Sequence, residues 1–170
     1  LQSNVVDSVS AYVADLASNI IATSEVELDG RRNSVRGMET NEGNMIADAM
    51  LWQANKNAAS FGAPNADIGI QNGGGIRNNN LIAAGPISEL NTFDMLPFSN
   101  FVTIVEDITP DRFKEMMENS VSRITGNGPS GGGTGRFAQI AGFSIVMDSA
   151  ATALSYDVNG NIVQAGSRII

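Results

Sequence analysis

The chain of 170 residues contains no histidine and no cysteine. The absence of histidine excludes histidine general bases, Ser-His-Asp triads and histidine-ligated zinc within these residues. The absence of cysteine excludes disulfides, thiolate catalysis and cysteine-based metal sites. The side chains left for chemistry are carboxylates, hydroxyls, amides and guanidinium groups. We therefore expect no metal site in this chain.

Long apolar runs are also missing. No run of about 18 apolar residues occurs, so no membrane span is predicted. The first residues, Leu1 to Asp7, lack the basic start and the cleavage site of a signal peptide, so any export signal is expected upstream. The hydrophobic content of 42% is enough for one sizeable core and too little for two comfortable domains.

Lysine is scarce, because Lys56 and Lys114 are the only lysines among the ten basic residues. The formal net charge is −8, the opposite of what a protein that coats nucleic acid needs, so no nucleic acid polymer is expected as a partner. The arginine fork binds carboxylate and phosphate oxygens two at a time. An acidic surface with a few arginines therefore suits one small anion.

Helical and extended patterns alternate along the chain and then give way to hairpins, which predicts an α+β fold with a mixed β-sheet flanked by helices. Helical spacing predicts helices over 5–22 and 43–59, a short helix capped by Ser88, and one that starts at Thr109-Pro110-Asp111. Strands are expected at 24–28, 66–71, 101–108 and 137–147, with a tight turn at Asn159-Gly160. The glycine-rich segment 126–136 is expected to be a mobile loop.

The first candidate site is the glycine-rich segment from Asn72 to Arg77. A strand that ends in three glycines, including Gly74, brings bare backbone close to a ligand and turns its amides toward it. Arg77 could then bind a phosphate or carboxylate. The alternative is a simple glycine-rich turn with Arg77 in a structural ion pair. The segment matches neither the P-loop nor the dinucleotide fingerprint.

Two further groups qualify as candidates. Arg32 and Arg36 lie in one loop ahead of a helix N-terminus, where an anion could dock, unless Glu39 or Asp48 pairs with one of them. Phe98 could stack on a nucleobase, and Asn100 could read a base edge. The alternative places Phe98 in the core and Asn100 in a turn.

Together these segments closely resemble the C-terminal domain of the 5′-nucleotidase family, which includes UDP-sugar hydrolases and cyclic-nucleotide phosphodiesterases. The resemblance runs from about Arg32 to Asp148. It rests on the strings R-x-x-E-x-N-x-G-N-x-I-A-D-A from Arg36, A-D-I-x-I-x-N-G-G-G-I-R up to Arg77, L-P-F-x-N up to Asn100, and G-R-F-x-Q-x-x-G from Gly135.

The resemblance implies that an N-terminal metallophosphoesterase domain with two divalent metal ions does the hydrolysis. This chain would recognise a nucleotide or nucleotide sugar, with no catalytic residue and no cofactor of its own. It also implies these site residues: Arg32, Arg36 and Arg77 on the phosphate or another anionic group, Asn72 and Gly74 in the pocket, Phe98 stacked on the base, and Asn100 on the base or sugar.

The domain organisation implied is an interdomain connector helix over 1–22 and the nucleotide-binding domain over 23–170, truncated at its C-terminal end. A second stacking aromatic, in a Gly-Gly-Asp-Gly-aromatic segment, is absent before Ile170, and Ser99 replaces the usual glycine. Weak binding of free nucleotide is therefore expected. A periplasmic, secreted or cell-surface location follows from the family. The alternative is a non-catalytic nucleotide-binding or surface module.

Overall fold

The computed structural model describes residues 2–125 and 134–170. Its helices are α1 (Gln2–Ser18), α2 (Arg32–Val35), α3 (Asn41–Ala58), α4 (Glu89–Met95) and α5 (Pro110–Val121), with short 3-10 turns at Ala59–Phe61 and Gly73–Gly75. Its strands are β1 (Ile20–Ser24), β2 (Leu28–Asp29), β3 (Gly69–Asn72), β4 (Leu81–Ile82), β5 (Gly85–Ser88), β6 (Ala138–Ala141), β7 (Ser155–Tyr156) and β8 (Ile162–Gln164).

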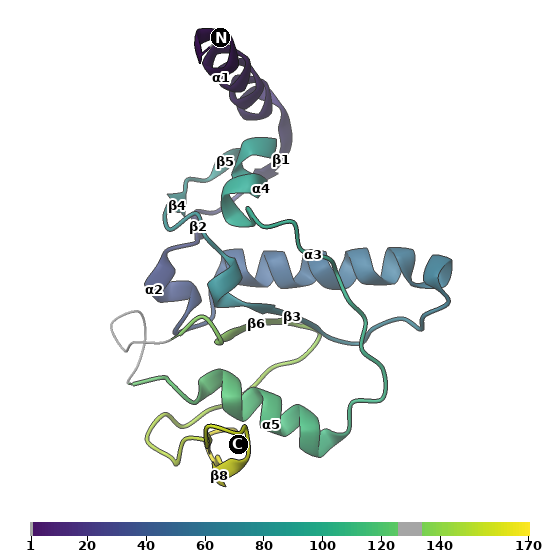
Figure 1. Cartoon of the computed structure of the whole chain (residues 1–170), viewed down its shortest axis with the longest axis vertical. Coiled ribbons are helices and arrows are strands. Elements are labelled where there is room, and N and C mark those ends of the chain that lie inside the picture. Colours follow the sequence, from purple (N-terminus) through teal and green to yellow (C-terminus); the bar gives the residue numbers. More distant parts are fainter. Residues whose placement is uncertain (1, 126–133) are drawn as a thin grey trace.

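The α+β class is confirmed, and the strands take the form of separate antiparallel pairs. Across the described residues these pairs are β1–β5, β2–β4, β3–β6 and β7–β8. Helix α3 packs on the β3–β6 pair, and α5 lies on the other side of that pair (Figure 1). The central pair is therefore enclosed between two helices.

Two apolar clusters hold this arrangement together. The larger lies between α3 and the N-terminal strand pairs and contains Leu28, Val35, Ile46, Ile76, Ile82, Ile87 and Met95. The smaller lies under the C-terminal part and contains Val121, Ile124 and Phe137, with Ile145, Met147 and Ile169 packed against it. Both clusters bury side chains next to the segments that carry the candidate site.

Helix starts follow the predicted capping chemistry. Ser88 caps α4 in a reciprocal capping box with Asn91. The Thr109 hydroxyl accepts from the Arg112 amide at the start of α5, where Pro110 occupies the first turn. The predicted turn at Asn159-Gly160 is also confirmed, since Gly160 has a φ of 84° and joins β7 to β8.

Several predicted elements are wrong in extent or kind. The strand expected at 24–28 does not form, because the chain bends at 25–26 between β1 and β2, and the strand expected at 66–71 begins only at Gly69. The first helix ends at Ser18, and the β-branched residues that follow it pair with β5 as strand β1. The strand expected at 101–108 is an exposed, unpaired segment, and Phe101 is 93% exposed. The strand expected at 137–147 stops at Ala141, because Gly142 turns the chain with a φ of 83°. The predicted mobility of 126–136 concerns residues that mostly lie outside the described ones.

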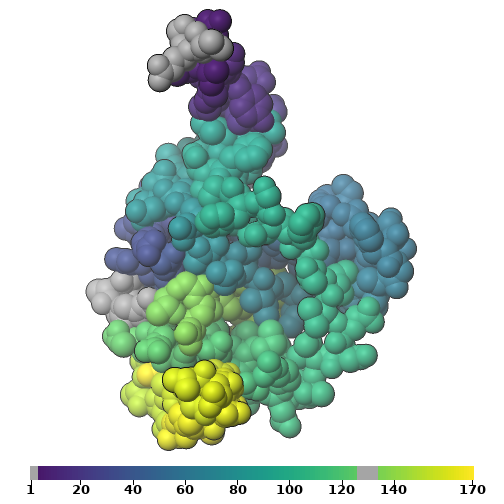
Figure 2. Space-filling model, in the orientation of Figure 1, coloured from purple at the N-terminus to yellow at the C-terminus, as the bar shows by residue number. Residues whose placement is uncertain are grey.

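Helix α1 stands out from the rest of the molecule (Figures 1 and 2). Leu16 is buried, whereas Val5, Val9 and Tyr12 are each more than half exposed. The assignment of 1–22 as an interdomain connector stays a prediction. None of the helices in the described part of the chain is long and apolar enough to cross a membrane.

Candidate functional site

The glycine-rich turn after β3 is fixed by a segment about sixty residues further along the chain. The Gly73 amide donates to the Phe137 carbonyl (2.7 Å), and the Gly74 amide donates to the Gly135 carbonyl (2.9 Å). A Cβ at Gly74 would lie 2.8 Å from the Gly135 Cα, so the two backbones approach too closely for a side chain. The expectation that these amides face a ligand is therefore wrong for Gly73 and Gly74, whose amides bind backbone.

Asn72 belongs to the same contact. Its Nδ2 donates to the Gly135 carbonyl (3.1 Å), and its Oδ1 accepts from the Gln71 side chain at 3.4 Å. Asn72 is nevertheless exposed, so its side-chain amide lies at the protein surface next to the glycine-rich turn. The structure thus brings Asn72 and Gly74 together through one shared acceptor.

Arg77 follows the turn and is held by hydrogen bonds of both its backbone and its side chain. Its amide donates to the Met95 carbonyl (2.9 Å), and its Nη1 donates to the Gly74 carbonyl (3.1 Å). Its guanidinium carbon lies 5.3 Å from the centre of the Phe98 ring. The alternative of a structural ion pair is wrong within the described residues, whose ion pairs are Arg31–Asp29 and Arg112–Glu115.

Arg32 and Arg36 come from the loop that precedes α3. Arg36 ends helix α2 and is half-buried, and its Nε finds no hydrogen-bond partner in the described part of the chain. Burial lowers the pKa of Arg36, and the positive charges of Arg32 and Arg77 lower this pKa further. The alternative, a pairing with Glu39 or Asp48, does not form among the described residues, and Glu39 accepts from the Asn44 side chain instead.

Three arginine side chains from two segments therefore bring their positive charges together without a carboxylate partner among the described residues. We call Arg32, Arg36 and Arg77 the arginine cluster. A cavity of about 420 Å³ includes Arg32 in its lining, together with Arg31, Asn33, Ser34 and Asn79, whereas Arg36 and Arg77 do not line it. Mutual repulsion and the lost hydration of Arg36 both cost free energy, and a bound anion would offset both costs.

Phe98 and Asn100 follow α4 on an exposed segment. The Phe98 ring is 51% exposed, so the alternative that places it in the core is wrong. The Asn100 amide donates to the Phe98 carbonyl (2.8 Å), which makes a tight turn between them. The Asn100 side chain is exposed, and no contact joins it to the other candidate residues among the described contacts.

Gln139 positions the loop that carries Arg36, a role that the sequence did not reveal. This residue is 1% exposed, and its Nε2 donates to the carbonyls of Val35 (3.1 Å) and Met38 (2.8 Å). Its Oε1 accepts from the Thr40 amide at 3.3 Å. One glutamine on β6 therefore ties the arginine loop to the strand beside the glycine turn.

Glu42 is a second residue that sequence reasoning missed. It is fully buried near the start of α3, its Oε2 accepts from the Asn78 side chain (3.1 Å), and its Oε1 has no partner in the described residues. Burial raises the pKa of Glu42 to about 7, and the negative charge of Asp29 contributes. The sequence offered no signal, because an acidic residue in a first helical turn is ordinary.

No group of three or more acidic residues that could hold a metal ion occurs in the part of the chain that the structure describes. What the site offers is charge, one aromatic face and amides. These groups can hold and orient a phosphorylated molecule.

Comparisons with known proteins show which family the chain belongs to. A family model described as the C-terminal domain of 5′-nucleotidases matches residues 20–170. The chain is 36% identical over 136 residues to the trifunctional nucleotide phosphoesterase protein YfkN of Bacillus subtilis (strain 168), which covers 80% of this chain and 8% of that protein. It is 34% identical over 128 residues to the 5′-nucleotidase of Bos taurus, which covers 72% and 20% respectively.

A solved structure gives the same result. The crystal structure of the 5′-nucleotidase precursor from Thermus thermophilus matches with a TM-score of 0.73 and 32% identity, over 99% of this chain and 28% of that one. The chain thus spans well under half the length of each of these relatives. Sequence and structure together show that the chain belongs to the 5′-nucleotidase family, as its C-terminal domain.

Proposed function

We propose that this domain binds a nucleotide or nucleotide sugar and positions its phosphate for hydrolysis by a metallophosphoesterase domain of the same protein. The observation that carries the proposal is the arginine cluster, three guanidinium groups without a carboxylate partner among the described residues, one of which lies over a half-exposed phenylalanine ring.

In this proposal Arg32, Arg36 and Arg77 bind the phosphate or another anionic group, and Phe98 stacks on the base. Asn72 contributes an amide beside the glycine turn, Gly74 allows the close backbone approach that holds Arg77, and Asn100 reaches the base or sugar. Forked guanidinium contacts to phosphate oxygens fix both position and orientation. Holding a substrate in its reactive geometry can itself supply a large share of a rate enhancement.

The hydrolytic step belongs to the other domain in this proposal, where two divalent metal ions supply the activated water and the charge stabilisation that phosphate ester cleavage needs. The named relatives are phosphoesterases and nucleotidases of greater length, which supports a partner domain. A snake venom 5′-nucleotidase among them supports a periplasmic, secreted or cell-surface location.

The direct test is a residue-resolved NMR titration of the 170-residue chain with AMP, with adenosine and inorganic phosphate as the two partial ligands. We expect AMP to shift the amides around Arg36, Arg77 and Phe98 and to bind more tightly than either part. Adenosine should affect mainly the segment at Phe98, and phosphate mainly the arginine cluster. If AMP leaves all three segments unshifted while shifting others, this assignment of the site is wrong.

A further inference from the structure

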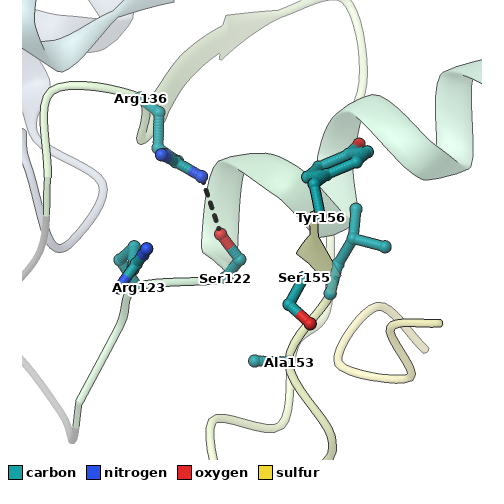
Figure 3. Close-up of a pocket in the computed structure, with 7 residues that line it drawn as sticks. Ser122, Arg123, Arg136, Ala153, Ser155 and Tyr156 are labelled. Carbon is teal, nitrogen blue, oxygen red and sulfur yellow. Dashed lines mark hydrogen bonds between the residues drawn. The ribbon is translucent and has the colours of Figure 1, made fainter. Parts of the chain in front are cut away.

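A second pocket lies between the end of α5 and strand β7, and the proposed nucleotide site uses none of its residues. It has a volume of about 380 Å³ and is lined by Ser122, Arg123, Arg136, Ala153, Leu154, Ser155 and Tyr156. Arg123 and Arg136 lie on one side of it, Ser155 and Tyr156 lie on the other, and Ser122 lies between them (Figure 3). Two cations and several hydroxyls thus border one hollow.

Neither arginine is neutralised by an acidic residue in the described part of the chain. Arg123 is exposed and has no ion pair among the described residues. Arg136 Nη1 donates to two neutral acceptors, the Asn119 Oδ1 (2.9 Å) and the Ser122 Oγ (3.3 Å). These bonds fix the orientation of the Arg136 guanidinium and leave its charge uncompensated. In a chain with a net charge of −8, two such groups in one pocket are a local positive site.

Two carboxylates of α5 already have hydrogen-bond donors, one of which is the hydroxyl of the pocket residue Tyr156. Glu115 accepts from Arg112 (2.7 Å) and from the Tyr156 hydroxyl (2.8 Å). Glu118 accepts from the backbone amides of Arg168 (3.0 Å) and Ile169 (2.9 Å). Both acidic groups therefore already have donors of their own, and neither forms an ion pair with the arginines of the pocket.

The carbonyl groups at the end of α5 would normally repel an anion. Here Arg168 covers them, because its Nη1 donates to the carbonyls of Val121 (2.8 Å) and Ile124 (2.9 Å). The negative end of the helix is thus neutralised from the side of the C-terminal segment. This leaves the positive charge of Arg123 and Arg136 to dominate the pocket.

We propose that this pocket binds the phosphate group of a small organic phosphate, at a site separate from the arginine cluster. Arg123 and Arg136 bind the phosphate oxygens, and Ser155 provides a hydroxyl from the opposite wall. Donors that approach from two walls suit a tetrahedral oxyanion better than a planar carboxylate. The remaining volume accommodates an organic body against the Tyr156 ring and Leu154.

The test is an NMR titration of the 170-residue chain with phenyl phosphate at constant ionic strength, with benzoate as the planar anion of similar size. We expect saturable shifts at the amides of Ser122, Arg123, Arg136 and Ser155, and weaker binding of benzoate. Arg123→Gln should raise the Kd at this pocket at least tenfold, which corresponds to about 1.4 kcal/mol. Because Arg123 is exposed and has no ion pair in the described structure, this variant keeps the fold.

Two control variants make the result specific. Lys114→Gln removes one positive charge from α5 outside the pocket lining and should leave the Kd unchanged. Arg77→Gln should weaken AMP binding at the first site and leave this pocket unaffected, so the two proposals fail independently. Equal effects of Arg123→Gln and Lys114→Gln would reduce the binding to general charge screening and overturn the proposal. Benzoate that binds as tightly as phenyl phosphate would also overturn it.

Discussion

The guanidinium carbon of Arg77 lies 5.3 Å from the centre of the Phe98 ring, although the two residues belong to segments on either side of β4, β5 and α4. This contact places the proposed phosphate-binding group beside the proposed stacking surface. A cation over an exposed aromatic face contributes about 0.5–1 kcal/mol. The contact therefore orients both side chains, and about half of Phe98 stays exposed.

Phe98→Leu should separate binding from stability. The ring is half-exposed, so little buried area is lost and the melting temperature should stay close to that of the unmodified protein. Nucleotide binding should weaken by about 1–3 kcal/mol, because a stacking partner is removed. A thermal melt beside a nucleotide titration measures both quantities. A lower melting temperature with unchanged affinity would remove Phe98 from the site.

Arg36→Ala and Arg77→Ala should each raise KM in the complete protein. Loss of a charged contact to phosphate costs roughly 1.5–3 kcal/mol, which is about ten- to a hundredfold. Lys114→Ala, which removes an exposed positive charge from α5, is the matched control and should change KM little. If all three variants have similar kinetics, the arginine cluster is not the phosphate site.

Gln139→Leu should weaken substrate binding indirectly, through the loop that carries Arg36. The glutamine is buried, and its removal leaves the Val35 and Met38 carbonyls without their donor, at a cost of about 1–3 kcal/mol for each unsatisfied group. The loop that carries Arg36 should loosen, which raises KM as well as lowering the melting temperature. Gln139→Glu offers a comparison of similar size that lacks the donating amide. Normal KM in a destabilised Gln139→Leu variant would limit this residue to a structural role.

Glu42 should make stability depend on pH. Its pKa in the folded protein is raised to about 7, above its ordinary value of 4.5, because burial disfavours the charged form. The folded state therefore binds the proton more tightly than the unfolded state. This contribution to stability is fully present below about pH 4.5 and is lost as the pH rises through about 7.

Glu42→Gln should remove most of this dependence, which amounts to roughly 2–3 kcal/mol. Denaturant unfolding of both proteins at about pH 5 and about pH 8, on either side of the raised pKa, measures the difference. The variant should be the more stable of the two at the higher pH, where the buried carboxylate of the unmodified protein is charged. Asp29, whose pKa is lowered mainly by its bond to Arg31, changes in neither protein within this range. Parallel pH profiles would show that Glu42 is not the titrating group.

The chain by itself should not hydrolyse AMP, ATP or UDP-glucose, even with added zinc, manganese or cobalt. It contains no histidine, and the residues that the structure describes show no clustered acidic ligands. A phosphate-release assay on purified protein checks this, with a mock purification from the same host as the control. Metal-dependent turnover above that control would contradict the assignment of hydrolysis to another domain.

Local chemistry accounts for the parts of the structure that the sequence predicted well. Ser88, Thr109 and Gly160 act through neighbours within four residues, so their caps and turn could be read from spacing alone. Helix α3 was predicted within two residues of its observed ends because its apolar positions repeat with the helical period. Each of these elements depends on information contained in a short stretch of chain.

The predictions that failed concern features that depend on contacts between distant parts of the chain. The β-branched and aromatic residues of 101–108 are typical of a strand, but a strand also needs a partner, and none pairs with this segment in the described structure. The glycines from Gly73 to Gly75 suggested amides open to a ligand, whereas two of those amides bind the distant carbonyls of Gly135 and Phe137. Local spacing placed Arg32 and Arg36 in one loop, but the approach of Arg77 to this pair is a tertiary property that only the family resemblance suggested.

The shared acceptor at Gly135 also sets an order of assembly. Its carbonyl accepts from Asn72, a residue 63 positions earlier, and from the Gly74 amide, so the turn that precedes Arg77 cannot form these bonds until the chain has been made beyond Gly135. Helices α3 and α5 depend on local contacts and can form first, whereas closure of so long a loop is slow. During synthesis, and during refolding from denaturant, recovery of nucleotide binding should therefore lag behind recovery of helix content.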